Sequence, residues 1–118
     1  MKKFLLGLFL GLLFIQVARA GEKGWFGFAT ALKASGIFNP TIFSVTVESI
    51  EAKSPAAEKS IAAGDQIIQL ENTDVPGHKA SELKPLMQKQ VGESLHLKLK
   101  RPNGEIYSVT LVAAKRPG

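Results

Sequence analysis

The sequence contains no cysteine among its 118 residues. No disulfide bond can form within the chain, so a small exported domain of this composition would be held together by packing alone. The same absence excludes a bacterial lipid anchor, because such an anchor is attached to a cysteine that follows the cleaved leader. The fold must therefore come from a hydrophobic core.

Histidine is also scarce, with two residues in the chain. His96 alternates with leucines beside Lys98, as a solvated strand residue would, and His78 follows a Pro-Gly pair near Asp74. A Ser-His-Asp site needs fixed geometry in a shielded cleft, and a metal site needs a cluster of ligands. The sequence therefore predicts a protein that is not an enzyme and that binds neither a metal nor a cofactor.

The charge balance gives little reason to expect nucleic acid. The formal net charge is +5, but Lys2, Lys3 and Arg19 belong to an N-terminal leader. Without them, 12 of the 15 basic residues face 10 acidic ones, for a net charge of +2. This mild excess favours solubility and does not indicate a nucleic-acid partner.

The leader has the three parts of a secretory signal peptide. Lys2 and Lys3 precede an apolar run over residues 4–17, and Ala18-Arg19-Ala20 has the small-x-small form of a cleavage site. An uncleaved membrane anchor is the alternative, but the run is shorter than the roughly 20 residues that span a bilayer. We expect cleavage after Ala20 and a periplasmic protein; the alternative is anchoring in the inner membrane by the uncleaved segment.

The mature chain alternates short strands with two helices. Ser54 is a candidate N-cap before Pro55, and Ser81 is a candidate cap that would place Pro85 in the first turn of the longer helix. Asn103-Gly104 is a strong hairpin signal. Strands are expected at residues 26–33, 42–50, 66–70, 95–100 and 106–112, and helices at 56–61 and 81–90.

Two local patterns carry further expectations. Phe43, Val45 and Val47 alternate with polar residues, which predicts that these three side chains share the buried face of a strand. Ile37 and Phe38 are apolar residues inside a loop, which suggests that part of the loop folds back on the core. The element order predicts an α+β fold: a strongly bent antiparallel sheet or partly open barrel of five to six strands, capped by two helices.

The stretch "GWFGF" at residues 24–28 places three aromatic rings beside two glycines near the expected mature N-terminus. A core strand would not need these glycines, and a flexible tail would not need the rings. From composition alone, a ligand-binding loop and an aromatic plug for an open barrel end are equally good explanations.

The motifs of the chain resemble those of PDZ domains. "SPAAEKSIAAGDQIIQL" is the most specific segment, with Ser54-Pro55-Ala56, Gly64-Asp65, Ile67 and Leu70 in the family's spacing. Phe26-Gly27-Phe28 resembles the hydrophobic-Gly-hydrophobic carboxylate-binding loop, and residues 95–112 resemble the closing hairpin of PDZ domains in bacterial periplasmic serine proteases. Two features depart from the common pattern: Glu71-Asn72 replaces Asn-Gly, and only residues 21–23 precede the loop.

The second departure implies the bacterial, permuted strand arrangement, in which the C-terminal strand 106–112 takes the place of a missing N-terminal strand. The leader features assign residues 1–20 to a signal peptide, and the resemblance implies that residues 21–118 form a PDZ domain. Such a domain binds the free C-terminus of another chain as an added strand.

The implied site has two parts. The backbone N–H groups of Phe26, Gly27 and Phe28 would hold the ligand carboxylate, and a Gly27→Glu substitution is expected to block it without unfolding the domain. The Phe26 and Phe28 side chains would wall the pocket for the last residue of the ligand. The side chains expected along the rest of the peptide groove are Thr30, Leu32, Ala80, Lys84 and Met87, whereas Leu83 and Leu86 would face the core.

The implied function is a non-catalytic peptide-binding module. Its partners would be C-terminal or extended segments of other exported or membrane proteins, bound to a monomer. The alternative is an accessory domain that docks substrates for a periplasmic protease or secretion machine.

Overall fold

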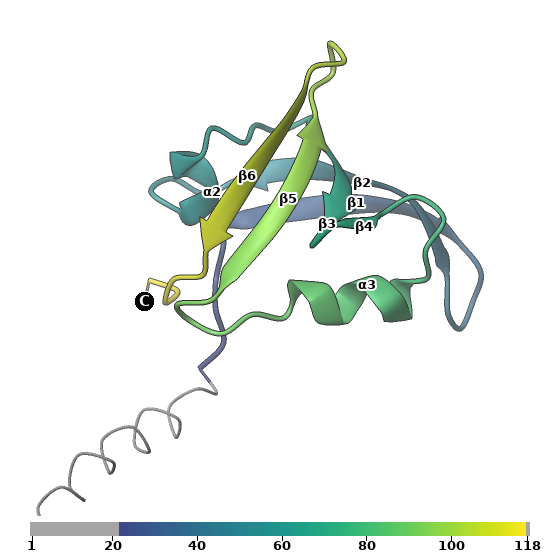
Figure 1. Ribbon diagram of the computed structural model, residues 1–118, viewed down its shortest axis with the longest axis horizontal. Coiled ribbons are helices and arrows are strands. Elements are labelled where there is room, and N and C mark those ends of the chain that lie inside the picture. The colour runs from purple at the N-terminus through teal and green to yellow at the C-terminus, as the bar shows by residue number, and fades with distance from the viewer. Residues whose placement is uncertain (1–21, 118) are drawn as a thin grey trace, which may run out of the picture.

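The computed structural model describes residues 22–117, which fold into an open antiparallel sheet with two short helices (Figure 1). The expected signal peptide lies outside the described residues. No helix within residues 22–117 is long and apolar enough to cross a membrane. The elements are β1 (Phe28–Ser35), β2 (Thr41–Ile50), α2 (Pro55–Glu58), β3 (Gln66–Leu70), β4 (Thr73–Asp74), α3 (Ala80–Met87), β5 (Ser94–Lys100) and β6 (Ile106–Val112).

The strand order is β1-β2-β3-β5-β6, with the short β4 paired to β3. The expected α+β fold is confirmed, with six strands in an open sheet and not a closed barrel. The permuted arrangement is also present. Just past β6, Ala114 and Trp25 exchange two backbone hydrogen bonds of 2.8 and 3.0 Å, which bring the C-terminal strand beside the N-terminal segment.

The core lies between the curved sheet and the helices. Leu95, Leu99 and Leu111 are completely buried, and Ala56 brings α2 against them. The first two alternate with polar residues on β5, so one face of that strand packs inward and the other faces solvent.

The helix cap predicted at Ser54 and the hairpin turn predicted at Asn103-Gly104 are both confirmed. The Ser54 hydroxyl accepts a hydrogen bond from the Ala57 N–H at 3.1 Å, and Pro55 is the first residue of α2. Gly104, with φ of +96°, closes the β5–β6 hairpin through a 2.8 Å bond to the Arg101 carbonyl. The short helix ends earlier than expected, at Glu58.

The alternation predicted for β2 is wrong at Phe43, whose side chain is 54% exposed. The register between β1 and β2 explains the error: Lys33 pairs with Ser44 and Ala34 pairs with Ile42, so Phe43 is the extra residue of a bulge. The bulge turns the side chains of the preceding residues to the opposite face of the strand, so Ile42 is buried in place of Phe43.

The loop between β1 and β2 does not fold its apolar residues onto the core. Ile37 and Phe38 are 87% and 98% exposed. The next two residues are the ones held against α3, because the Ala80 N–H donates to the Pro40 carbonyl and the Ser81 N–H to the Asn39 side chain. Ile37 and Phe38 are left projecting from the end of the hairpin.

The longer helix begins and ends earlier than expected. Lys79 is its N-cap residue, so Ser81 lies inside the first turn, and Pro85 lies in the second turn and not in the first. Pro85 has no N–H to donate to the Ser81 carbonyl, so one helical bond is missing. The backbone becomes extended at Gln88, which ends the helix after Met87.

Candidate functional site

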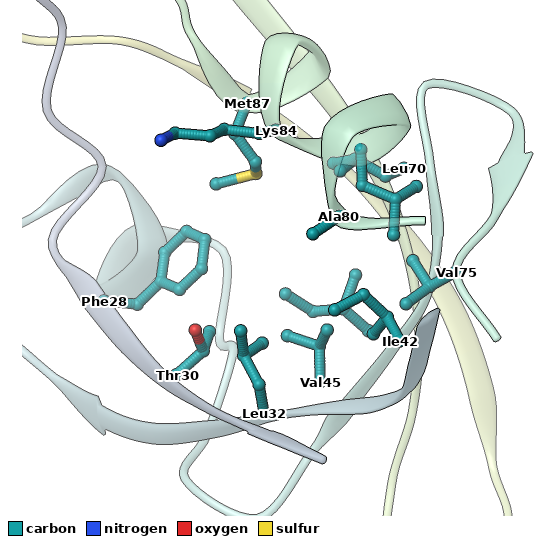
Figure 2. A pocket seen from close by; sticks show the side chains of 12 residues that line it. Phe28, Thr30, Leu32, Ile42, Val45, Leu70, Val75, Ala80, Lys84 and Met87 are labelled. Atoms are coloured by element: carbon teal, nitrogen blue, oxygen red, sulfur yellow. The ribbon is translucent and has the colours of Figure 1, made fainter. Parts of the chain in front are cut away.

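An apolar groove of about 330 Å³ lies between β1 and α3 (Figure 2). Twelve side chains line it, and only one of them carries a charge. They are Phe28, Thr30, Leu32, Ile42, Val45, Ile67, Leu70, Val75, Ala80, Leu83, Lys84 and Met87.

One wall of the groove is β1. This strand is the first in the sheet order, so its outer edge has no partner strand within residues 22–117. Phe28, Thr30 and Leu32 all line the groove, as the period of two in a strand requires. The wall therefore combines alternating side chains with an unpaired backbone edge.

The opposite wall is α3, which contributes Ala80, Leu83, Lys84 and Met87. In Figure 2 the Met87 and Lys84 side chains lie across the groove from Phe28. The structure thus brings five of the residues expected from the sequence to the groove, namely Thr30, Leu32, Ala80, Lys84 and Met87. Leu83, expected in the core, is 6% exposed and also reaches the groove.

The floor of the groove was missed by sequence reasoning. It consists of Ile42 and Val45 from β2, Ile67 and Leu70 from β3, and Val75 just after β4. The motif spacing pointed to Ile67 and Leu70, but a spacing along the chain does not say that a residue lies under a groove.

The loop that leads into β1 has a well-defined geometry. Gly27 has φ of +84°, in the left-handed region that favours glycine. The Phe26 and Gly27 carbonyls accept hydrogen bonds from the N–H groups of Ala56 (3.0 Å) and Glu51 (2.8 Å). Within the described part of the chain, the N–H groups of Phe26 and Gly27 themselves donate to no acceptor.

The Phe26 side chain, which was expected to wall the ligand pocket, packs into the core. It is 8% exposed and belongs to the core cluster, and it is not among the side chains that line the groove. Its ring centroid lies 6.4 Å from that of Phe28, which does line the groove.

The expectation that Gly27→Glu would leave the fold intact is wrong. A Cβ atom on Gly27 would overlap the buried side chain of Ser54, and the positive φ adds strain to any non-glycine residue. Gly27 is therefore required for the packing of the loop against Ser54, independently of any ligand that the loop binds.

Within residues 22–117, no hydrogen bond joins His78 to Asp74, and the buried Nδ1 of His78 has no hydrogen-bond partner. Asp74 accepts a 2.9 Å hydrogen bond from Gln69. His96 lies 3.2 Å from Glu71 on the sheet. Across residues 22–117, no group of three or more His, Cys, Asp or Glu side chains could hold a metal ion.

Glu71 is held in its charged form by its neighbours. Partial burial raises the pKa of this carboxyl, but hydrogen bonds from the Lys89 side chain and the His96 backbone, with the charges of both residues, outweigh it. The net effect is a pKa below the usual range. The Lys89 ammonium lies 3.0 Å from the carboxylate, so this cluster ties the segment after α3 to the end of β3.

The chain belongs to the PDZ domain family: the family model described as PDZ domain matches residues 10–112. PDZ domains are in general non-catalytic modules that bind peptides. None of the curated protein sequences matches the chain.

Solved structures of proteases share the fold. The PDZ domain of a carboxy-terminal protease from Vibrio cholerae, in complex with a peptide, is 22% identical with a TM-score of 0.58, covering 82% of this chain and 98% of that one. The photosystem II D1 C-terminal processing protease is 20% identical with a TM-score of 0.62, covering 92% of this chain. The HtrA-type protease AlgW with a decapeptide is 20% identical with a TM-score of 0.57, also covering 92%. The chain spans only 27% and 35% of the latter two proteins.

Proposed function

We propose that this domain binds extended peptides that end in a free, apolar C-terminus, and that the peptide adds as a strand to β1. The observation that carries the proposal is the continuity of two features. An apolar groove runs between the unpaired β1 edge and α3, and the loop with the unused Phe26 and Gly27 N–H groups leads directly into β1.

The direction of the backbone in β1 supports strand addition. The Gly27 carbonyl bonds to Glu51, on the β2 side. Because the N–H and C=O groups of successive strand residues point to opposite sides, those of Phe28 point to the free edge. Phe28 thus adds a third N–H close to those of Phe26 and Gly27, and consecutive N–H groups of this kind bind carboxylates without any cationic side chain.

The groove also supports a preference for an apolar last residue. Phe28, the first residue after the loop, lines the groove with Met87 on the opposite wall, and neither side chain can solvate a charge. A ligand of this kind would bind with micromolar affinity, about −8 kcal/mol.

The proposed site can be tested with paired peptides. Fluorescence polarisation would compare peptides from a random C-terminal library, each with a free and an amidated terminus. Amidation should remove most of the affinity, because it deletes the carboxylate that the N–H groups would bind. Equal binding of the two forms would refute the carboxylate mechanism.

A matched pair of variants locates the binding surface. Leu32→Asp places a charge in the groove, whereas Phe43→Asp makes the same kind of change at a side chain of similar exposure that does not line it, 54% against 58%. Leu32→Asp should abolish peptide binding and Phe43→Asp should leave it unchanged.

The cellular setting is part of the proposal. We infer that residues 1–20 are removed as a signal peptide and that residues 21–118 act as a PDZ domain in the periplasm. Intact mass of the protein recovered from cells should correspond to a chain that starts at Gly21, and a full-length, membrane-bound species would contradict it.

A second candidate is an accessory role in which the same groove docks substrates for a periplasmic protease or secretion machine. The fold shared with the PDZ domains of proteases favours it. A protease or secretion apparatus encoded beside this gene would support that role over a free-standing adaptor.

A further inference from the structure

The apolar groove is longer than a single ligand side chain. Phe28, Thr30 and Leu32 all line it from β1, and the rise of a strand places the first and the last of them about 13 Å apart. The last side chain of a bound peptide, opposite Phe28, would not reach the Leu32 end. The length of the groove therefore raises the question of which upstream residue that end would hold.

The alternation of β1 is regular along the free edge. Each of the two register shifts between β1 and β2 places its extra residue in β2, Glu48 in one and Phe43 in the other. The backbone of Leu32 therefore has the same orientation as that of Phe28, with its N–H and C=O groups pointing to the free edge. β1 continues to Ser35, so this edge extends beyond Leu32.

A peptide whose terminal carboxylate lies at the loop has a fixed register on this edge. The loop precedes β1, so the peptide runs antiparallel to β1, with its last residue opposite Phe28. Its third residue from the end then lies opposite Thr30, and its fifth lies opposite Leu32. Directly opposed side chains share one face of a sheet, so the last, third and fifth side chains enter the groove. The second and fourth point away from it.

The Leu32 end of the groove is lined by apolar side chains. Val45 is the cross-strand partner of Leu32 in β2, and Ile42 lies next to it in the floor. Figure 2 shows Val75 at the same end of the groove. Ile42 and Val75 are buried, whereas Leu32 is 58% exposed. A large apolar side chain placed here would cover Leu32 and contact a floor that is already dry.

The polar members of the groove lie elsewhere. Thr30 lies between Phe28 and Leu32 along β1, and in Figure 2 the Lys84 side chain extends toward the Phe28 end of the groove, away from Val75. A polar or charged ligand residue at the Leu32 end would find no partner among the side chains that line the groove. It would lose water without gaining a hydrogen bond.

We propose that the Leu32 end is a second apolar subsite, which selects peptides with a large apolar residue at the fifth position from their free C-terminus. This inference rests on the proposed strand addition and narrows the ligands to those with two apolar anchors, the last residue and the fifth. Burial of a leucine at the fifth position should tighten binding about tenfold.

The test uses three labelled nonapeptides with free carboxylates and fluorescence polarisation with the unmodified protein. The host peptide is serine and threonine throughout except for a terminal leucine. The second peptide adds a leucine at the fifth position from the end, and the third adds it at the fourth. The second and third peptides have the same composition, but their added leucines lie on opposite faces of the strand. The second should bind about tenfold tighter than the host, and the third should stay within about twofold of it.

A pair of variants assigns the effect to the proposed subsite. Leu32→Ser should reduce the preference for leucine at the fifth position over the fourth to about twofold or less, because the side chain that it contacts is gone. Phe43→Ser removes an apolar side chain of similar exposure that does not line the groove, 54% against 58%, and should keep the full preference. The preference is a ratio of two affinities, so a general weakening of binding does not change it.

The outcomes separate this subsite from the carboxylate mechanism. Equal affinity for the two leucine-shifted peptides, with binding still lost on amidation, would overturn the second subsite and leave the proposed function standing. A preference for the fifth position that survives amidation would support the subsite and contradict the carboxylate mechanism. Both proposals would fail if none of the peptides bound.

Discussion

Gly27 lies directly against the buried side chain of Ser54. Ser54 also caps α2 through Ala57 and donates a 2.7 Å hydrogen bond to the Glu51 carbonyl. The loop that leads into β1 is therefore packed against the start of α2. Gly27, which lies between Phe26 and Phe28 in this loop, is fixed in place by the core beneath it.

Gly27→Ala should destabilise the fold by about 2–4 kcal/mol. The new methyl group would overlap Ser54, which is completely buried, and the residue would also occupy a left-handed conformation. Denaturant unfolding of the variant measures the loss. Gly104→Ala is the matched control, because Gly104 has a similar φ of +96° but no atom near the position of a Cβ. It should lose only about 1 kcal/mol, and an equal loss at both sites would mean that Ser54 moves aside freely.

An ionic network around the buried Asp65 joins the turn before β3 to the β5–β6 hairpin. The Asp65 carboxylate, 1% exposed, accepts hydrogen bonds from the Tyr107 hydroxyl and from Arg101, whose Nη1 lies 2.8 Å away. The Arg101 guanidinium stacks 4.1 Å from the centre of the Tyr107 ring. Burial raises the pKa of Tyr107 well above its usual range, and the hydrogen bond to Asp65 and the negative charge of Asp65 raise it further.

Tyr107→Phe should lower stability near neutral pH and flatten its alkaline pH dependence. The lost hydrogen bond to a charged acceptor is worth about 1.5–3 kcal/mol. Because the folded protein holds the Tyr107 proton more tightly than the unfolded chain, this contribution is complete below about pH 10 and is lost as the pH rises further. Urea unfolding at several pH values from neutral to about 11 should show a shallower decline for the variant than for the wild type. Parallel declines would contradict the role assigned to Tyr107.

Local signals in the sequence predicted local structure well. The β3 strand was predicted at residues 66–70, as found, and the Ser54 cap and the Asn103-Gly104 turn were predicted from residue chemistry alone. Each of these features is determined by residues within a few positions of one another.

Features that depend on distant contacts were not predictable in this way. The bulge at Phe43 is set by the register against β1, and no pattern within β2 reveals it. The Gly27–Ser54 contact joins residues from two separate motifs. The floor of the groove is assembled from β2, β3 and the residue after β4, so it exists only once the sheet has curved.

Lys84 is the charged side chain among those that line the groove, and its position on α3 makes it a candidate for ligand selectivity. An acidic residue upstream of the peptide terminus could pair with it. Since Lys84 is exposed, the pair would contribute only about 0.2–1 kcal/mol, or roughly a twofold to fivefold change in affinity.

Lys84→Glu should therefore weaken binding of peptides that carry an upstream Asp and strengthen binding of the same peptides with Lys at that position. Fluorescence polarisation with both peptide series gives a charge-swap cycle, whose coupling energy isolates the pair from the loss of packing. Lys59→Glu, an exposed change just after α2, is the control because it alters the net charge equally. If both variants shifted the two series alike, the effect would be general charge attraction rather than contact at the groove, and it would fade in high salt.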